Sequence, residues 1–400
     1  MLVTTKQPSS NPRLVKEAIA LANSGYAVSV VYNYWSAWAD EADINILKTY
    51  SLITWIKAGS NPSLNSLAYW YTRIRHKCYR TIGGIFKKNV TLQALSLSQF
   101  YPELKAKACS IAADLYIAHN LGALPVAVAA AKKNNSNYSF DAEDFHRSQE
   151  AGNTKETAIT RLIEDAYFAD AVFITAASPL IAAEYKKNYP SLQFTVINNV
   201  FSKQQQPSFV SISNAPLKLF WFSQTVGLKR GVQDIIAAMN LITDFEIELT
   251  ILGDTSEQVK QVFNTVFTNK KHQLIFLPAC NEQALINTAA WHHIGLALEP
   301  GFSLNNNIAL SNKLFTYLLA GNAAILSGTP AQQLFYNEYP GTGWCYSTGD
   351  IKALADILEQ AYNNENLLQS KRQAAWQLAN TKLNWENEQE VFLNLVKKAV

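Results

Sequence analysis

Two adjacent cations stand between an apolar run and an expected helix. The segment Ser223–Gly231 reads SQTVGLKRG, follows the apolar run Leu217–Phe222 and contains Lys229 and Arg230. A strand–loop–helix connection of this kind offers an anion backbone N–H groups, the positive end of a helix dipole and side-chain charge. We therefore expect Lys229 and Arg230 to bind a diphosphate. The residues alone leave open an ordinary loop whose cations are solvated.

A second polar segment follows another apolar run. Glu299–Gly321 reads EPGFSLNNNIALSNKLFTYLLAG and comes directly after Ile294–Leu298. Gly301 permits a close backbone approach, and Asn312 and Lys313 stand near the expected start of a helix, where an anion is favoured. This order predicts a ligand site at the strand end. The alternative is a surface loop followed by an amphipathic helix.

Several well-known site motifs are missing from the sequence. There is no GxGxxG after the first strand, no GxxxxGK[ST], no HExxH and no GxSxG, which argues against dinucleotide oxidoreductases, P-loop enzymes, zinc proteases and α/β-hydrolases. No Asp-x-Asp pair follows a strand, and the four cysteines form no CxxC. We expect no metal and no resident cofactor.

The composition limits the class of protein. The 400 residues carry 34 Lys+Arg against 31 Asp+Glu, and 48% of them are hydrophobic. This excludes a disordered chain and argues against a dedicated nucleic-acid binder. We find neither a secretory leader nor an apolar stretch long enough to span a bilayer. We expect a cytoplasmic protein, and the second location that we consider is the inner face of the membrane.

Short apolar runs alternate with helical segments in the first half, which is typical of parallel α/β layers. Pro12–Asn23 is an expected helix, capped by Asn11 and ended by Gly25. Residues 33–105 are less regular. The expected strands of this half are Met1–Thr5, Ala27–Tyr32, Leu115–His119, Tyr138–Phe140, Ala171–Thr175 and Phe194–Ile197.

The polar, proline-containing segment Ser202–Ala215 interrupts this pattern, and we interpret it as a linker. After it the alternation restarts, with a helix at Gly231–Leu241 and another at Leu310–Ala320. The pattern predicts an α/β chain of two Rossmann-like domains with a ligand cleft between them, at the carboxyl ends of both sheets. The expected boundaries are 1–203, 204–382, and a C-terminal helix at 383–400. The expected strands of the second half are Leu217–Phe222, Ile247–Leu252, Gln273–Phe276, Ile294–Leu298 and Ala323–Leu326.

The two polar segments together resemble the donor-binding half of GT-B fold retaining glycosyltransferases of the family-four-like group. Lys229-Arg230-Gly231 is similar to that group's loop ending in Lys-Gly. Asn312-Lys313-Leu314-Phe315-Thr316-Tyr317, followed by Gly321, is similar to its Asn-Lys-Leu-Phe-Glu-Tyr helix. The resemblance implies that the C-terminal helix crosses back to the N-terminal domain.

The first half carries three further resemblances. The run from Asn11 to Ala18 is similar to the group's Asp-Pro-Arg-x-x-Lys-Glu-Ala opening, and Ala118-His119-Asn120 to its Ala-His-Asp. Residues 140–144 are similar to its Tyr-Asp-x-His-Glu. The resemblance extends from about residue 11 to 385. It departs at Ser223-Gln224, where Gly-Arg is common, at Thr316, where Glu is usual, and at Glu143, where His is usual.

The resemblance implies transfer of a sugar from a nucleoside-diphosphate sugar to an acceptor hydroxyl, with retention, in polysaccharide, lipopolysaccharide or glycolipid assembly. It implies catalytic roles for His119, Lys229, Arg230 and Glu299, and acceptor contacts for Asn11, Arg13, Asp141 and Glu143. The implied donor-binding residues are Ser223, Gln224, Gly301, Phe302, Ser303, Asn312, Lys313, Leu314 and Thr316. A nucleotide-sugar epimerase of the same fold and a non-catalytic nucleotide-sugar binder remain alternatives.

Aromatic and basic residues alternate in Leu67–Asn89, LAYWYTRIRHKCYRTIGGIFKKN. Such a mixture suits an anionic bilayer surface. The expected partners are therefore the donor, a saccharide or lipid-linked acceptor, and an anionic membrane through residues 67–89, with no nucleic acid. A helix with inward aromatics and solvated cations is the alternative.

Overall fold

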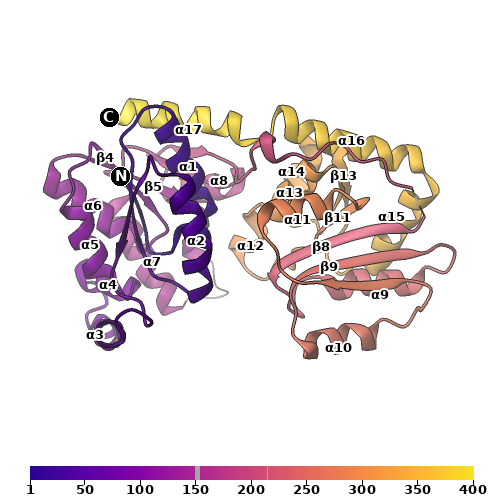
Figure 1. Ribbon diagram of the computed structural model, residues 1–400, viewed down its shortest axis with the longest axis horizontal. Helices are drawn as coiled ribbons and strands as arrows, with labels where there is room; N and C mark the ends of the chain where they lie inside the picture. Colours follow the sequence, from indigo (N-terminus) through magenta and orange to yellow (C-terminus); the bar gives the residue numbers. More distant parts are fainter. Residues whose placement is uncertain (149–153, 214) are drawn as a thin grey trace. The chain divides into compact units, whose positions relative to one another are not determined.

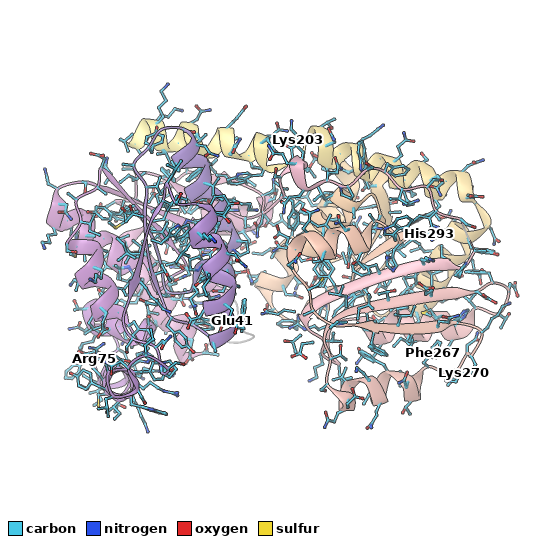
Figure 2. All side chains as sticks on the ribbon, in the orientation of Figure 1. Glu41, Arg75, Lys203, Phe267, Lys270 and His293 are labelled. Atoms are coloured by element: carbon cyan, nitrogen blue, oxygen red, sulfur yellow. The ribbon has the colours of Figure 1, made fainter. Side chains whose placement is uncertain are left out.

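The computed structural model describes residues 1–148, 154–213 and 215–400. The chain forms two compact units (Figure 1): Met1–Ile197 with Gln389–Val400, and Asn198–Glu388. In each unit side chains fill the space between one sheet and its helices (Figure 2). The first unit ends at Ile197, six residues before the expected boundary at 203. The last residues of the C-terminal helix belong to the first unit.

The first unit is built on a parallel sheet of order β3-β2-β1-β4-β5-β6-β7. Helices α5 and α6 lie on one side of it and α1 and α2 on the other (Figure 1). The strands are β1 (Leu2–Thr4), β2 (Ser29–Asn33), β3 (Thr54–Ala58), β4 (Leu115–His119), β5 (Asn137–Ala142), β6 (Ile174–Ala176) and β7 (Phe194–Val196). The helices are α1 (Pro12–Asn23), α2 (Ala37–Thr49), α3 (Ser66–Ile85), α4 (Val90–Leu97), α5 (Tyr101–Cys109), α6 (Leu124–Asn134), α7 (Lys155–Tyr167) and α8 (Pro179–Asn188).

Helix α1 begins and ends where the sequence indicated. The Asn11 side chain accepts a hydrogen bond from the Leu14 N–H at 3.2 Å, and Pro12 occupies the first turn. Leu14 and Ala18 are fully buried, so this face of the helix packs on the sheet. Beyond its end, Gly25 has φ +86°, a conformation that glycine adopts without strain.

Two parts of this unit differ from the expectation. The region 33–105, which shows little periodicity, holds α2, β3 and the helices α3 to α5. Strand β6 begins at Ile174, three residues later than expected, because Ala171 and Val172 already bond outside the strand ladder, to the carbonyls of Phe168 and Tyr138.

The second unit has a parallel sheet of order β10-β9-β8-β11-β12-β13. Its strands are β8 (Leu217–Thr225), β9 (Ile247–Asp254), β10 (Gln273–Leu277), β11 (Ile294–Ala297), β12 (Ala323–Leu326) and β13 (Gly343–Cys345). Its helices are α9 (Val232–Leu241), α10 (Glu257–Val266), α11 (Glu282–Ala289), α12 (Leu304–Ile308), α13 (Asn312–Ala320), α14 (Pro330–Glu338), α15 (Ile351–Asn363) and α16 (Glu365–Thr381), and α17 (Trp385–Ala399) continues from it.

A hydrophobic core covers each face of this sheet. Ile235 and Met239 of α9 pack with Leu354 of α15 on one face, whereas Leu314 and Leu318 of α13 pack on the other. These cores fix α9, which follows the polar segment Ser223–Gly231, and α13, which ends the polar segment Glu299–Gly321. Strand β13 was not expected; it is three residues long and lies at the sheet edge.

The segment 202–215 is not a detached linker in the part that the structure describes. Gln206 Nε2 donates to the Trp376 carbonyl at 2.9 Å, and the Trp376 indole donates to the Pro207 carbonyl at 2.9 Å. Arg372 donates to the Val210 carbonyl at 2.9 Å. The segment therefore lies along α16 as part of the second unit. Asn214 lies outside the described residues.

Candidate active site

The ends of four strands in the second unit surround a pocket of about 370 Å³. All of them are carboxyl ends, because the sheet is parallel and the lining residues follow β8, β11, β12 and β13. This edge of an α/β sheet is where ligands bind. The lining residues are Leu228, Lys229, Gly231, Gln233, Asp234, Leu298, Glu299, Pro300, Ser327, Tyr346, Thr348 and Gly349.

The turn between β8 and α9 brings Lys229 to the pocket. Gly231 has φ +79°, and a Cβ atom placed on it would lie 2.6 Å from Cβ of Leu298. Glycine therefore allows the start of α9 to approach the end of β11. Lys229 and Arg230 are exposed, and Arg230 donates to Ser223 Oγ at 3.2 Å. The loop offers positive charge next to the first N–H groups of α9.

Glu299 and Lys313 form an ion pair beside the pocket. Lys313 Nζ lies 3.1 Å from Glu299 Oε1, and both side chains are largely buried. Asn306 Nδ2 donates to the other carboxylate oxygen at 3.3 Å, and Lys313 Nζ lies 5.7 Å above the Trp221 ring. These contacts hold a carboxylate and an ammonium side by side at the end of β11.

The turn after Glu299 is held by its own side chains. The Gly301 N–H donates to Asn306 Oδ1 at 2.6 Å, and Asn307 Nδ2 donates to the Gly301 carbonyl at 3.3 Å. Ser303 is buried and caps α12, whereas the neighbouring Phe302 is 67% exposed. Of these residues, Phe302 offers a free apolar surface to a ligand.

The far wall of the pocket was not predicted from the sequence. Ser327 Oγ accepts from the Glu299 N–H at 2.7 Å, and Thr348 Oγ1 donates to the Ser327 carbonyl. Burial raises the pKa of Asp234, and a hydrogen bond from the Gly349 N–H partly offsets that effect. The available signal was position, since Ser327 directly follows the apolar run Ala323–Leu326.

None of the nine expected donor-binding residues is part of the pocket lining, and Arg230 also lies outside it. Ser223 and Gln224 belong to the end of β8 rather than to the loop. Leu314 and Thr316 are fully buried, and the Thr316 hydroxyl donates to the Asn312 carbonyl at 2.9 Å. The Thr316 hydroxyl is thus bonded within its own helix in this structure. The Asn312 side chain accepts from Asn199 at 3.0 Å.

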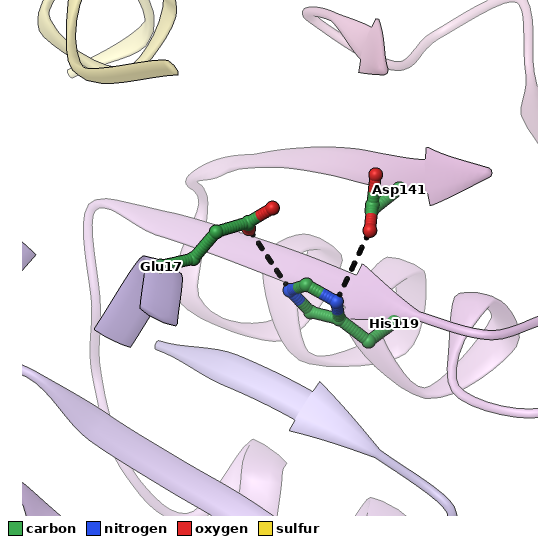
Figure 3. Close-up of side chains that lie close together, drawn as sticks. All are labelled: Glu17, His119 and Asp141. Carbon is green, nitrogen blue, oxygen red and sulfur yellow. Dashed lines mark ion pairs between the residues drawn. The ribbon is translucent and has the colours of Figure 1, made fainter. Parts of the chain in front are cut away.

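The first unit contains a buried charged cluster at the ends of its own strands (Figure 3). His119 ends β4 and pairs in register with Asp141 on β5, and Arg13 and Glu17 project from successive turns of α1. His119 Nε2 lies 3.1 Å from Glu17 Oε2, and Nδ1 lies 3.3 Å from Asp141 Oδ2. The four side chains are at most 2% exposed.

Arg13 binds Asp141 through two hydrogen bonds, from Nε at 2.6 Å and from the terminal guanidinium nitrogen Nη2 at 2.8 Å. Its other terminal nitrogen donates to the Ile197 carbonyl at 2.5 Å. Glu143 is the cluster's partly exposed member, 31% exposed, with Oε1 3.4 Å from His119 Nδ1. The expected acceptor residues Arg13 and Asp141 thus bind each other in the interior, and buried Asn11 caps α1.

The protonation of the cluster follows from its charges. Burial alone would lower the pKa of His119, but the Glu17 carboxylate and hydrogen bonds to Asp141, Glu143 and Glu17 raise it well above its usual value. Burial would raise the pKa of Asp141, but Arg13 and His119 hold it below its usual range. Burial raises the pKa of the Glu17 carboxyl, and His119 and Arg13 offset part of that effect.

Glu17, His119 and Asp141 each place a ligand-type atom within 4.8 Å of the others. A divalent ion does not fit this arrangement, because the Arg13 guanidinium already occupies both oxygens of Asp141. A dication there would meet a buried cation at contact distance. We therefore interpret the cluster as a structural network rather than a metal site.

The fold is similar to those of solved glycosyltransferases, although no protein-family profile and no curated protein matches the sequence. HepE from Anabaena, in complex with UDP and glucose, matches over 100% of both chains with TM-score 0.69 and 12% identity. The match to sucrose-phosphate synthase from Thermosynechococcus elongatus covers 100% of this chain and 98% of the synthase chain, with TM-score 0.72 and 12% identity. A TarM mutant from S. aureus, in complex with fondaparinux, alpha-GlcNAc-glycerol and UDP, covers 99% of both chains with TM-score 0.67 and 9% identity. The expected fold class, two Rossmann-like domains of the GT-B type, is confirmed.

Proposed function

We propose that this protein is a glycosyltransferase that moves a sugar from a nucleoside-diphosphate sugar to an acceptor hydroxyl, with retention of configuration. The assembly of a polysaccharide, lipopolysaccharide or glycolipid is the context we propose. The observation that carries the proposal is the pocket at the strand ends of the second unit, where Lys229 and the first turn of α9 stand near the Glu299–Lys313 pair.

The cationic side of the pocket suits the leaving group. A departing nucleoside diphosphate gains negative charge while the anomeric carbon becomes positive. Fixed cations and N–H dipoles lower such a barrier, each by a few kcal/mol at most. Lys229 and Arg230 are assigned to the diphosphate, together with the N–H groups that follow Gly231. Lys313 is assigned as a further phosphate contact. Its ion pair with Glu299 holds the ammonium in position beside the pocket.

Glu299 is assigned to the hydroxyl groups of the sugar. Its carboxylate is fixed by Lys313 and Asn306, so little order must be gained on binding. The exposed ring of Phe302 and the backbone of Gly301 complete this side. HepE and TarM were solved with UDP, which makes UDP the first nucleotide to test.

We propose that catalysis needs no divalent ion. In phosphoryl-binding sites a metal neutralises the charge of the leaving phosphate. Here the exposed cations Lys229 and Arg230 are available for that task. The two pocket carboxylates are engaged, Asp234 by the Gly349 N–H and Glu299 by Lys313.

The first unit is assigned to the acceptor through Glu143. Among the implied acceptor residues Glu143 reaches the surface, whereas Asn11, Arg13 and Asp141 are buried. His119 is buried as well, so it is assigned to hold Glu143 and Asp141 in place. Glu143 is the candidate contact for an acceptor hydroxyl.

A non-catalytic nucleotide-sugar binder is the second candidate. The buried Thr316, which stands where related enzymes carry a ribose-binding Glu, favours it. A third alternative, a nucleotide-sugar epimerase, would release a stereoisomer of the donor without any acceptor.

The test starts with thermal unfolding in the presence of UDP, GDP, dTDP, ADP, CMP and their common sugar conjugates, with EDTA and then with Mg²⁺. A ligand at 100 times its Kd stabilises the folded state by about 2.7 kcal/mol. The stabilising donor is then incubated with saccharide and lipid-linked acceptors, and products are identified by mass spectrometry and NMR. An α-configured product from an α-linked donor supports retention. Binding without turnover supports the second candidate, and no stabilisation by any nucleotide contradicts the proposal.

A further inference from the structure

Helix α3 is attached to the first unit along one side. Thr72 accepts from Gln99 Nε2 at 2.8 Å, Arg75 binds Glu103 at 2.6 Å, and the Gly83 carbonyl accepts from Gln93 at 2.7 Å. These partners lie in α4, in α5 and between them. Arg75 in Figure 2 marks the position of this helix. The side of α3 that carries them is thereby fixed toward the protein.

The opposite side of α3 is apolar and exposed. Its residues are separated by three, four or eight positions, which places them in one stripe along the helix. Leu67, Ile74 and Ile85 are 87%, 64% and 70% exposed. We call the outward set the α3 stripe: Leu67, Trp70, Tyr71, Ile74, Ile82 and Ile85. Contiguous exposed apolar surface of this kind marks a binding face.

Two exposed tryptophans lie near the start of α2. The rings of Tyr34 and Tyr69 meet edge to face with centroids 6.1 Å apart, which places the segment before α2 beside the helix. Trp35, in the segment before α2, and Trp38, in the first turn of α2, are 60% and 49% exposed. Indole rings are the side chains that favour the bilayer–water interface.

Cations border the α3 stripe. Arg73 and Lys77 lie along one edge of it, and Lys87 and Lys88 follow its end. The Arg73 guanidinium stacks on the Trp70 ring at 5.1 Å. Residues 67–89 contain no Asp or Glu. In the described part of the chain Arg75 and Arg80 of this helix have carboxylate partners, Glu103 and Glu156, whereas no such pair involves Arg73 or Lys77.

We propose that the α3 stripe binds the surface of an anionic lipid bilayer. The helix lies parallel to the surface, with the stripe at the acyl boundary and Arg73, Lys77, Lys87 and Lys88 at the lipid phosphates. A second copy of this helix is a poorer partner, because any pairing of α3 with itself sets cations against cations without an acidic residue. None of the described helices has the length and apolarity to cross a bilayer. The inference stands apart from the proposed function, since the stripe shares no residue with the pocket.

The test is co-sedimentation of the full chain with vesicles of phosphatidylcholine alone and of phosphatidylcholine with 30 mol% phosphatidylglycerol. We expect binding to the anionic vesicles, weakened when salt rises from 0.1 to 0.5 M because the contact is screened. Each cation near such a surface contributes about fivefold, equivalent to ~1 kcal/mol. The double variant Arg73→Gln/Lys77→Gln should therefore lose about 25-fold in partition coefficient, and Trp70→Ser/Ile74→Ser at least tenfold.

Matched variants at other exposed positions test whether binding depends on the α3 stripe itself or on any loss of charge or apolar surface. Lys132→Gln/Lys133→Gln changes two exposed cations of α6 in the same unit, and Trp291→Ser/Leu241→Ser changes two exposed apolar residues of the second unit. Both should partition as the wild type does. Circular dichroism and nucleotide stabilisation of each variant check that it is folded, and nucleotide stabilisation also reports on the proposed function separately.

Three results would overturn the inference. The first is no binding to phosphatidylglycerol vesicles by a folded wild-type chain. The second is an equal loss in the stripe variants and in their matched controls. The third is a dimer in analytical ultracentrifugation that dissociates in Trp70→Ser/Ile74→Ser, which would assign the stripe to a second copy of the chain.

Discussion

Gly231 lies against Leu298, so close that a Cβ atom at position 231 would fall 2.6 Å from the Leu298 Cβ. This approach joins the cationic loop after β8 to the end of β11, from which Glu299 follows. The distance between the expected diphosphate contacts and the expected sugar contacts is thereby set by one glycine.

Gly231→Ala should destabilise the second unit by about 2–4 kcal/mol, because it adds left-handed strain of roughly 1–2 kcal/mol to a clash that the side chain cannot avoid. Gly349 has a similar φ of +84° with nothing within 4 Å of its Cβ position. Gly349→Ala should cost only the strain, about 1–2 kcal/mol. Urea denaturation measures both variants, and equal losses would show that Gly231 is not needed for the close approach.

Glu299→Gln should separate recognition of the sugar from recognition of the nucleotide. The variant keeps its size but loses a charged acceptor, which is worth about 1.5–3 kcal/mol in a hydrogen bond. Affinity for the nucleotide sugar and the transfer rate should fall roughly 10–100-fold, whereas affinity for the nucleoside diphosphate should not fall, because the cations assigned to the phosphate are kept. Isothermal titration with both ligands makes the comparison.

Lys313→Gln is the control for the comparison between nucleotide sugar and nucleoside diphosphate. Its ammonium is assigned to the phosphate, so this variant should bind both ligands more weakly. If Glu299→Gln and Lys313→Gln weaken the two ligands in the same pattern, the separate assignments of sugar and phosphate are incorrect.

His119 should make the first unit less stable at alkaline pH. Its pKa in the folded chain is raised well above the value near 6.5 of an unfolded histidine. Its contribution is therefore fully present below pH 6.5 and is lost as the pH rises through the folded pKa, by at most about 1.4 kcal/mol per pH unit. Free energies of unfolding at pH 6, 7, 8 and 9 should show this slope in the wild type and lack it in His119→Gln.

His292 provides a control of opposite sign. Burial lowers the pKa of His292 to about 4. Its contribution therefore changes between pH 4 and 6.5 and is constant above that range. The difference between wild type and His292→Gln should be flat from pH 7 to 9. A similarly flat difference for His119→Gln would mean that His119 is neutral in the folded chain.

Asp141→Ala should reduce mainly stability, whereas Glu143→Ala should reduce mainly the affinity for the acceptor. Removing Asp141 leaves the buried Arg13 guanidinium with only the Glu17 carboxylate, 3.5 Å away, which costs up to about 3–5 kcal/mol. Removing the partly exposed Glu143 should change stability by no more than about 0.5 kcal/mol, while the KM for the acceptor rises. Denaturation and initial-rate kinetics distinguish the two, and a Glu143→Ala variant with unchanged acceptor kinetics would remove the acceptor assignment.

The sequence was sufficient for the fold class, and it singled out two of the residues that line the pocket, Lys229 and Glu299. The apolar runs at Leu217–Phe222 and Ile294–Leu298 predicted strands, and in parallel sheets the polar residues after such strands gather at one edge. Lys229 and Glu299 were found in this way. Ser327 and Thr348 follow strands too, but hydroxyl and glycine residues carry little specific signal outside their tertiary setting.

The remaining differences arise from long-range contacts. Thr316 faces the core because α13 packs on the sheet through that side, a rotation that the spacing of apolar residues alone does not specify. Arg13 and Asp141, 128 positions apart, meet because β5 lies next to β4 and α1 covers both ends. A charged residue read from sequence as a surface contact can thus be an interior partner.

The pocket of the second unit should bind a nucleoside diphosphate through Lys229 and the adjacent Arg230, and titration calorimetry with UDP measures this binding. GDP, dTDP and ADP follow if UDP gives no heat, each in EDTA and in Mg²⁺. We expect one nucleoside diphosphate to bind in EDTA, with a loss of at least tenfold in Lys229→Gln/Arg230→Gln and none in Lys132→Gln/Lys133→Gln. Binding that is unchanged in Lys229→Gln/Arg230→Gln, or no binding of any nucleoside diphosphate by the folded wild type, would show that these two cations do not form a diphosphate site.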